Sequence, residues 1–230
     1  MKVVLLLSGG LDSGTLLSRL IAAGNEVHPI SIRYGQRHVK EVIAAQHLLE
    51  FYSIKTRWKV VDLSVTHMFD SSDPSTLINP TAEMPHKTYQ EIATDVGPSP
   101  TYVPFRNSIF ISIAVAHALQ IGAEYVYLAT HAEDARAFAY PDCTPEFNGP
   151  MSAAVFVGTY YKVRLGVPFQ WMMKKDIVAQ GVRDHAPFHL MWSCYEGEDK
   201  PCGKCPTCVE RIQAFADNGI PDPALSASAG

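Results

Sequence analysis

Residues 8–13 read SGGLDS and have the residue types of a phosphate-binding loop. Two consecutive glycines allow a sharp turn and let the backbone approach a ligand closely. The residues that follow predict a helix, whose free N–H groups and dipole favour an anion. Ser8 and Ser13 add hydroxyl donors, and Asp12 suits a contact through Mg²⁺ or a structural hydrogen bond. The segment therefore predicts a site for a phosphorylated ligand.

Two common phosphate-binding patterns do not fit this loop. A Walker loop closes with Gly-Lys-Ser/Thr, and the dinucleotide pattern needs a third spaced glycine. The plain alternative is a turn between a strand and a helix, with a serine as the helix cap. The loop directly follows the apolar run 3–7. This position favours ligand binding, because ligands of parallel sheets bind beyond the carboxyl ends of the strands.

Four of the five cysteines lie close together near the end of the chain. Cys194, Cys202, Cys205 and Cys208 form the pattern Cys-x7-Cys-x2-Cys-x2-Cys. Thiolates bind Zn²⁺ tetrahedrally, and Cys-x2-Cys pairs bring two sulfurs to one metal. Four ligands leave no open position, so we expect a structural zinc site. An iron–sulfur cluster is the main alternative, since it also takes four thiolates, and a redox-active cysteine pair is a weaker one.

The apolar pattern predicts alternating strands and helices that position these residues. We expect strands at 3–7, 27–32, 59–63, 125–129 and 167–171, and helices at 11–23, 39–51, 107–120, 152–162 and 174–180. Residues 71–104 are rich in Pro, Ser, Thr and Asp and predict a long loop. Such alternation is typical of a doubly wound, parallel, Rossmann-like α/β sheet. The predicted fold is this sheet with a C-terminal zinc knuckle.

The composition is that of an ordinary globular protein, with 47% hydrophobic and 18% charged residues. A formal net charge of −4 speaks against a broad basic surface for nucleic acid. The apolar run after Lys2 is too short for a signal peptide, and no run has membrane-spanning length, so we expect a cytoplasmic protein. We expect an α/β domain at 1–190, a four-cysteine segment at 191–217 and a tail at 218–230.

Further segments, in order along the chain, make the pattern more specific. They read YGQRH at 34–38, VPFRN at 103–107, YPDCTPEF at 140–147, WSCY at 192–195 and KPCGKC at 200–205. Together with the loop at 8–13 they resemble the 7-cyano-7-deazaguanine synthase family, which belongs to the ATP pyrophosphatase superfamily. The resemblance extends from about residue 2 to 223 and implies an adenine nucleotide alpha-hydrolase-like fold.

The resemblance implies a ligase of queuosine and archaeosine biosynthesis. One ATP adenylylates the carboxylate of 7-carboxy-7-deazaguanine, and ammonia displaces AMP to give the amide. A second ATP adenylylates the amide oxygen, and loss of AMP leaves the nitrile. Each activation releases pyrophosphate, in agreement with the loop at 8–13. The resemblance further implies Mg²⁺ with ATP, small-molecule substrates and a homodimer.

The resemblance and the side-chain chemistry together assign candidate site residues. The catalytic candidates are Asp12, Arg106 and Lys174, since Arg suits bidentate oxyanion contacts and Lys a point charge. The residues expected to bind ATP are Leu7, Ser8, Gly9, Gly10, Leu11, Asp12, Ser13, Gly14, Thr15, Leu16 and Leu17. Those expected to bind the acceptor are Gln36, His38, Arg106, Asn107, Asp142 and Glu146. The carboxylates of the last two suit the paired N–H donors of a guanine-like edge, with loop capping as the plain alternative.

Three features depart from the common family pattern. Phe105 stands where a small residue is frequent, Met173 stands where Ser or Thr often precedes the lysine, and the loop 131–139 is longer. We therefore keep as an alternative a deazaguanine ligase that couples the activated acid to an amine on a macromolecule. A tRNA-thiolating enzyme is a further alternative, but it needs catalytic thiols and a basic surface. A zinc-knuckle nucleic-acid binder would leave the loop at 8–13 unexplained.

Overall fold

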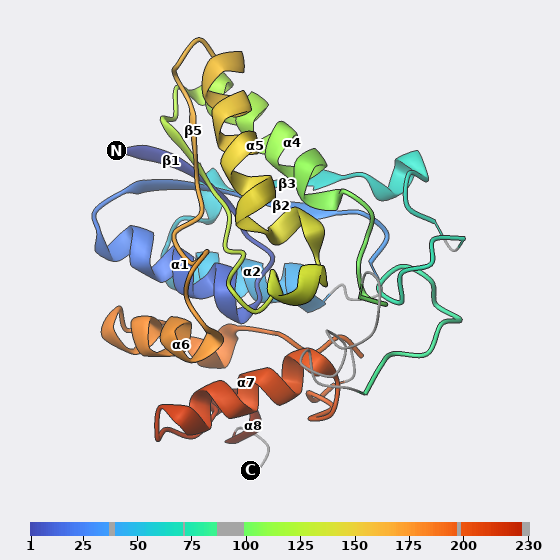
Figure 1. The fold of residues 1–230 in the computed structure, drawn as a ribbon. Coiled ribbons are helices and arrows are strands. Elements are labelled where there is room, and N and C mark those ends of the chain that lie inside the picture. Colours follow the sequence, from blue (N-terminus) through green and yellow to red (C-terminus); the bar gives the residue numbers. More distant parts are fainter. Residues whose placement is uncertain (37–39, 71, 87–98, 197–198, 227–230) are drawn as a thin grey trace.

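The computed structural model describes residues 1–36, 40–70, 72–86, 99–196 and 199–226. Within these residues, five parallel strands form one sheet in the order β3-β2-β1-β4-β5 (Figure 1). The strands are β1 Lys2–Leu6, β2 Glu26–Arg33, β3 Lys59–Asp62, β4 Tyr125–Tyr127 and β5 Arg164–Gly166. The helices are α1 Leu11–Ala22, α2 Lys40–Phe51, α4 Arg106–Ile121, α5 Pro145–Gly158, α6 Lys174–Arg183, α7 Pro206–Asp217 and α8 Pro223–Ser226. Short 3-10 helices lie at Lys55–Arg57, Ser64–Thr66, Arg136–Phe138, Pro141–Cys143 and Phe188–Leu190.

Strand β1 lies at the centre of the sheet, between β2 and β4. Val3 pairs with Val27 of β2 on one side and with Tyr125 of β4 on the other. The chain builds outwards through β2 and β3, then returns to add β4 and β5 on the opposite side of β1. The strand order therefore reverses between β1 and β4. In doubly wound sheets such a reversal opens a crevice at the carboxyl ends of the strands.

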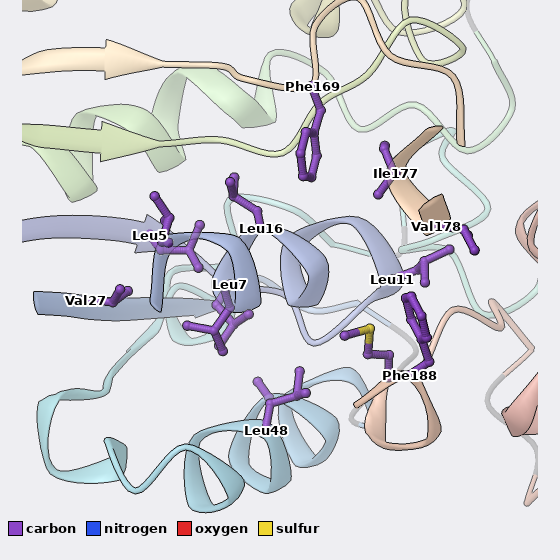
Figure 2. Close-up of a cluster of buried hydrophobic side chains, with 14 of the residues drawn as sticks. Leu5, Leu7, Leu11, Leu16, Val27, Leu48, Phe169, Ile177, Val178 and Phe188 are labelled. Carbon is purple, nitrogen blue, oxygen red and sulfur yellow. The ribbon is translucent and has the colours of Figure 1, made fainter. Parts of the chain in front are cut away.

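Apolar side chains cover both faces of the sheet. Val3 and Leu5 belong to a cluster that α1, α2, α6 and α7 share, whereas Val4 and Leu6 belong to a cluster on the side of α4 and α5. This alternation follows the two-residue period of a strand. Figure 2 shows the first cluster, in which Phe169 packs with Leu5 and Leu16. Two covered faces explain why the strands read as continuous apolar runs.

Two predicted elements are placed wrongly. The strand expected at 167–171 lies at Arg164–Gly166, because Gly166 pairs with Tyr127 and the chain then turns Phe169 into the core. The helix expected at 152–162 spans Pro145–Gly158. It starts earlier because the Thr144 hydroxyl accepts a hydrogen bond from the Phe147 N–H (3.2 Å) and Pro145 suits the first turn.

A buried arginine links the C-terminal segments to one another. Arg211 of α7 donates to both carboxylate oxygens of Asp222, at 2.8 and 3.0 Å, and to the carbonyl oxygens of Met191 and Phe188. Both charged groups are almost fully buried, and bidentate pairing of this kind adds geometric specificity. No helix within the described residues is long and apolar enough to cross a membrane.

Candidate active site

The loop between β1 and α1 has the geometry of an anion cradle. Gly9 has φ +96°, and a Cβ there would lie 2.1 Å from the Glu41 carbonyl oxygen, so only glycine fits this turn. The Ser8 hydroxyl accepts from the Gly10 N–H (3.1 Å) and lies 2.9 Å from the Ser13 hydroxyl. The N-cap residue of α1 is Gly10, which has no side chain to accept from the N–H groups of the first turn. These N–H groups can therefore donate to an anionic ligand.

A cavity of about 240 Å³ opens beyond the carboxyl ends of the strands. The loop residues Leu7, Ser8, Gly10, Leu11, Asp12 and Ser13 contribute to its lining. Arg106 and Asn107 of α4 and Lys174 of α6 contribute further polar groups. The rest of the predicted ATP-binding stretch lies behind the cavity. Thr15, Leu16 and Leu17 are fully buried in the core, and Gly14 packs against Met191.

Lys174 is a buried cation among carboxylates. Its Nζ lies 3.6 Å from Asp12 Oδ2 and 3.3 Å from Glu210 Oε2, and its side chain is 7% exposed. Burial by itself lowers the pKa of this amine, but Asp12 and Glu210 raise it well above its ordinary value. Lys174 is therefore a fixed positive charge beside the phosphate loop. Burial raises the pKa of Glu210 to about 7.

The loop 131–139 lies against the same cluster. His131 is buried, and its Nε2 lies 3.7 Å from Asp12 Oδ2 and 3.5 Å from Asp134 Oδ2. Glu133 accepts a hydrogen bond from the Lys174 N–H at 2.7 Å. Sequence reasoning missed His131 and Glu133, because a single histidine or glutamate in a polar loop carries no pattern. The Asp12 Oδ1 atom is buried and has no hydrogen-bond partner in the described structure.

A second group of polar and aromatic side chains surrounds Arg106. Its Nη1 donates to the Tyr34 hydroxyl (2.7 Å), and its guanidinium lies 5.2 Å from the Tyr34 ring and 5.8 Å from the Phe110 ring. Its Nε is buried without a partner among the described residues. Burial opposes the charge, but Tyr34 and Asp142 raise the pKa of Arg106 above its ordinary value. Glu41 lines the same cavity, and burial raises the pKa of its carboxyl to about 7.

Both carboxylates that were predicted to bind the acceptor lie outside the cavity lining. Asp142 is 4% exposed, and its Oδ2 accepts from the Asn107 N–H at 2.9 Å, so it caps the start of α4. Asn107 also donates to the Asp142 carbonyl oxygen (3.2 Å) and the Cys143 sulfur (3.2 Å). Burial raises the pKa of Asp142. Glu146 is exposed in the first turn of α5. Cys143 is buried.

Gln36 and His38 are the two acceptor-binding candidates that follow the second predicted strand. Gln36 lines the cavity, but its side chain is engaged with the backbone. Its Oε1 accepts from the Tyr34 N–H (2.7 Å), and its Nε2 donates to the Ile32 carbonyl oxygen (3.3 Å). It therefore shapes the turn after β2. His38 lies outside the described residues.

The four clustered cysteines form a group suited to a metal ion. The sulfurs of Cys194, Cys202, Cys205 and Cys208 lie within 4.8 Å of one another. The Cys202 N–H points at the Cys194 sulfur (3.3 Å) and the Cys205 N–H at the Cys202 sulfur (3.2 Å). Tetrahedral coordination with metal–sulfur bonds of about 2.3 Å requires sulfurs roughly 3.8 Å apart. The donor set fits such a site.

The cysteine cluster is joined to the phosphate loop. The Trp192 N–H donates to the Gly9 carbonyl oxygen at 3.0 Å, and the Thr207 hydroxyl donates to the Ser193 carbonyl oxygen at 2.6 Å. Ser193, Tyr195 and Thr207 also line the cavity. The segment that carries the cysteines therefore forms part of the wall of the site.

A doubly wound parallel sheet with a phosphate cradle after its first strand defines an α/β nucleotide-binding enzyme. The family profile described as "Queuosine biosynthesis protein QueC" matches residues 2–219, and the chain belongs to this family. The resemblance stated from the sequence is thereby confirmed.

Relatives agree over nearly the full length. The chain is 42% identical over 227 residues to the 7-cyano-7-deazaguanine synthase of Archaeoglobus fulgidus, covering 98% of this chain and 90% of that protein. It is 38% identical over 226 residues to that of Thermoplasma acidophilum, covering 96% and 90%. Among solved structures, a 4-thiouridine synthetase–RNA complex with bound ATP has a TM-score of 0.49 and 17% identity, covering 94% of this chain and 50% of that chain. The family assignment rests on the sequence relatives.

Proposed function

We propose that this chain converts 7-carboxy-7-deazaguanine and ammonia to 7-cyano-7-deazaguanine, with two ATP consumed and two AMP and two pyrophosphate released. The observation that carries the proposal is one cavity that joins the phosphate cradle at Ser8–Ser13 to Arg106 and Lys174. Its lining combines a site for a triphosphate with a cation for an anionic acceptor. The curated relatives named above carry this activity in their names.

The reaction balances as two adenylyl transfers. A carboxylate oxygen attacks the α-phosphorus of ATP, the bond to pyrophosphate breaks, and an acyl adenylate forms. Ammonia attacks the acyl carbon, loses a proton, and displaces AMP, which leaves with that oxygen. The amide oxygen then attacks a second ATP in the same way. Loss of two protons and of the second AMP completes the carbon–nitrogen triple bond.

The residues divide these tasks by charge. The N–H groups of the loop and the hydroxyls of Ser8 and Ser13 hold the phosphates, which the buried Lys174 ammonium neutralises. The unpartnered, buried Oδ1 of Asp12 fits Mg²⁺, an ion that prefers oxygen ligands and would offset phosphate charge. Arg106 binds the acceptor carboxylate, because its Nε remains available beside the hydrogen bond to Tyr34.

Zinc is proposed at the four-cysteine group, with Cys194, Cys202, Cys205 and Cys208 as ligands. Four thiolates close the coordination shell, so the metal stabilises structure and takes no part in the reaction. The spacing of the sulfurs and the N–H groups aimed at them support this assignment. A metal bound there would hold Ser193 and Thr207 beside the phosphate loop.

We also propose a homodimer. Two grounds support it: the family resemblance and the exposed apolar side chains at the end of α5. Val157, Tyr160 and Tyr161 are 63%, 84% and 66% exposed there. Such apolar exposure is typical of an interaction surface.

Product analysis tests the proposed function. The chain is incubated with ATP, Mg²⁺, ammonium and the carboxylic acid, and the products are identified by mass spectrometry. We expect the nitrile, with two AMP for each nitrile and the amide accepted as a substrate. Formation of ADP, or an amide that is never dehydrated, would contradict the proposal. Consumption of the acid only when a macromolecular amine is present would favour the coupling ligase instead.

A further inference from the structure

Three carboxylates line the cavity, and two of them are already engaged. Asp12 lies 3.6 Å from the Lys174 ammonium. Asp134 accepts a hydrogen bond from the His131 N–H at 3.1 Å and lies 3.5 Å from the ring nitrogen of that histidine. The carboxylate of Glu41 forms no hydrogen bond or ion pair with any residue that the structure describes. Among the carboxylates that the structure describes in the cavity lining, Glu41 is thus the one without an ion-paired or hydrogen-bonded partner, and it can accept from a ligand.

Glu41 also lies in surroundings that suit a flat aromatic ligand. It lines the same cavity as Tyr34 and Arg106. The rings of Tyr34 and Phe110 line this cavity and lie 5.3 Å apart. The buried Arg106 Nε adds a donor without a partner among the described residues. An acceptor, a donor and aromatic faces are thus gathered in one place.

This combination complements one edge of a 2-amino-6-oxo purine-like ring. That edge presents the 6-oxo oxygen, the N1–H and the 2-amino group side by side, as one acceptor followed by two donors. A carboxylate accepts from the two donors, and a guanidinium donates to the oxygen. In the proposed substrate, the 6-oxo group and the 7-carboxylate project from atoms bonded to the same ring carbon. One guanidinium can therefore serve both groups.

We propose that Glu41 recognises the deazapurine by accepting hydrogen bonds from its N1–H and 2-amino group, with Arg106 as the neighbouring donor. This inference rests on the proposed function and names the residue that selects its substrate. It replaces Asp142 in that role, because the Asp142 carboxylate is occupied by the first turn of α4. Burial raises the pKa of the Glu41 carboxyl to about 7, and hydrogen bonds from two N–H donors of the substrate would favour its charged form.

The test compares the acid with its 2-desamino analogue in the wild type, Glu41→Gln and Glu41→Asp. Glu50→Gln is the matched control, since Glu50 lies at the exposed end of the same helix and contacts Lys55 and Gln46. We expect Glu41→Gln to raise KM for the acid roughly 10- to 100-fold, with a smaller change in kcat and in KM for ATP and ammonium. The preference for the 2-amino compound should fall below about 3-fold, from roughly 10-fold or more in the wild type.

Two results would overturn the inference. One is that Glu41→Gln keeps the wild-type preference for the 2-amino compound. The other is that its KM rises for ammonium and not for the acid. Glu41→Asp keeps the charge on a shorter side chain and should show an intermediate KM, so it decides the question if Glu41→Gln is poorly folded. If the wild type makes no nitrile, the proposed function fails. In that case the affinity of the acid for the wild type and for Glu41→Gln, measured by calorimetry, still tests the role of Glu41. Equal affinities would reject that role.

Discussion

Substitution of Glu41 should change the stability of the folded chain in a pH-dependent way. Burial raises the pKa of the Glu41 carboxyl from its ordinary value of 4.5 to about 7. The folded state therefore binds more protons than the unfolded state between these two values. It follows from linkage that wild-type stability is fully present below about pH 4.5 and falls as the pH rises through 7. Glu41→Gln removes this loss, because an amide does not titrate.

The magnitude follows from the same two pKa values. At 1.36 kcal/mol for each pKa unit, the difference corresponds to about 3 kcal/mol, which is an upper bound. Two effects reduce it. The side chain is partly accessible through the cavity, and a negative charge in the first turn of α2 gains about 0.3–1 kcal/mol from the helix dipole. We therefore expect Glu41→Gln to gain about 1–3 kcal/mol relative to the wild type between pH 5 and pH 8.

Urea unfolding of both proteins at pH 5, 6, 7 and 8 measures this gain. The two curves should lie close together at pH 5 and separate steadily towards pH 8, with the variant more stable. Glu50→Gln, whose carboxylate is solvated at the surface, should follow the wild type across the range. Parallel behaviour of Glu41→Gln and the wild type would refute the reasoning, because it would mean that the Glu41 carboxylate is fully hydrated.

Three further predictions concern the loop and the cysteine cluster. Gly9→Ala should destabilise the fold by more than Gly24→Ala in chemical unfolding, since both have positive φ but only Gly9 has backbone atoms in the space of a Cβ. Gly24→Ala should cost about 1 kcal/mol, and equal losses would contradict the packing argument. Asp12→Asn should lower AMP formation roughly 10²–10³-fold with little change in melting temperature, and wild-type turnover would reject its role. Cys202→Ser should lose the metal and speed hydrogen exchange in residues 191–217 but not in the sheet. An unchanged exchange pattern would count against a structural zinc.

The parts of the site that lie within one short segment were predictable. The geometry of the loop at 8–13 and of the cysteine group depends mainly on neighbouring residues in the chain, because a glycine turn and a Cys-x2-Cys pair are formed by local backbone. Arg106 and Lys174 were proposed from the family resemblance and their side-chain chemistry, and both contribute to the cavity lining. Their surroundings could not be anticipated, since the Lys174 ammonium is paired with carboxylates from two separate segments, Asp12 and Glu210.

The residues that sequence reasoning missed act only through tertiary packing. Glu41 stands at the start of an amphipathic helix, where an acidic residue is ordinary, and its burial in the cavity wall comes from the fold. Asp142 was assigned to the substrate with loop capping as the alternative, and its carboxylate accepts from the Asn107 N–H at the start of α4. The apolar run around Phe169 resembled a strand, but Phe169 fills the core and Gln170 donates to the Cys143 carbonyl oxygen at 3.1 Å.

The central claim is that both oxygens of the acceptor carboxylate leave as part of AMP. Isotope transfer tests it most directly, with the acid labelled by ¹⁸O in both carboxylate positions and the nucleotides analysed by mass spectrometry after complete turnover. We predict that each of the two AMP molecules formed for each nitrile carries one ¹⁸O, and that pyrophosphate and solvent carry none. Label found in phosphate, pyrophosphate or water would contradict adenylylation of the acid and the amide.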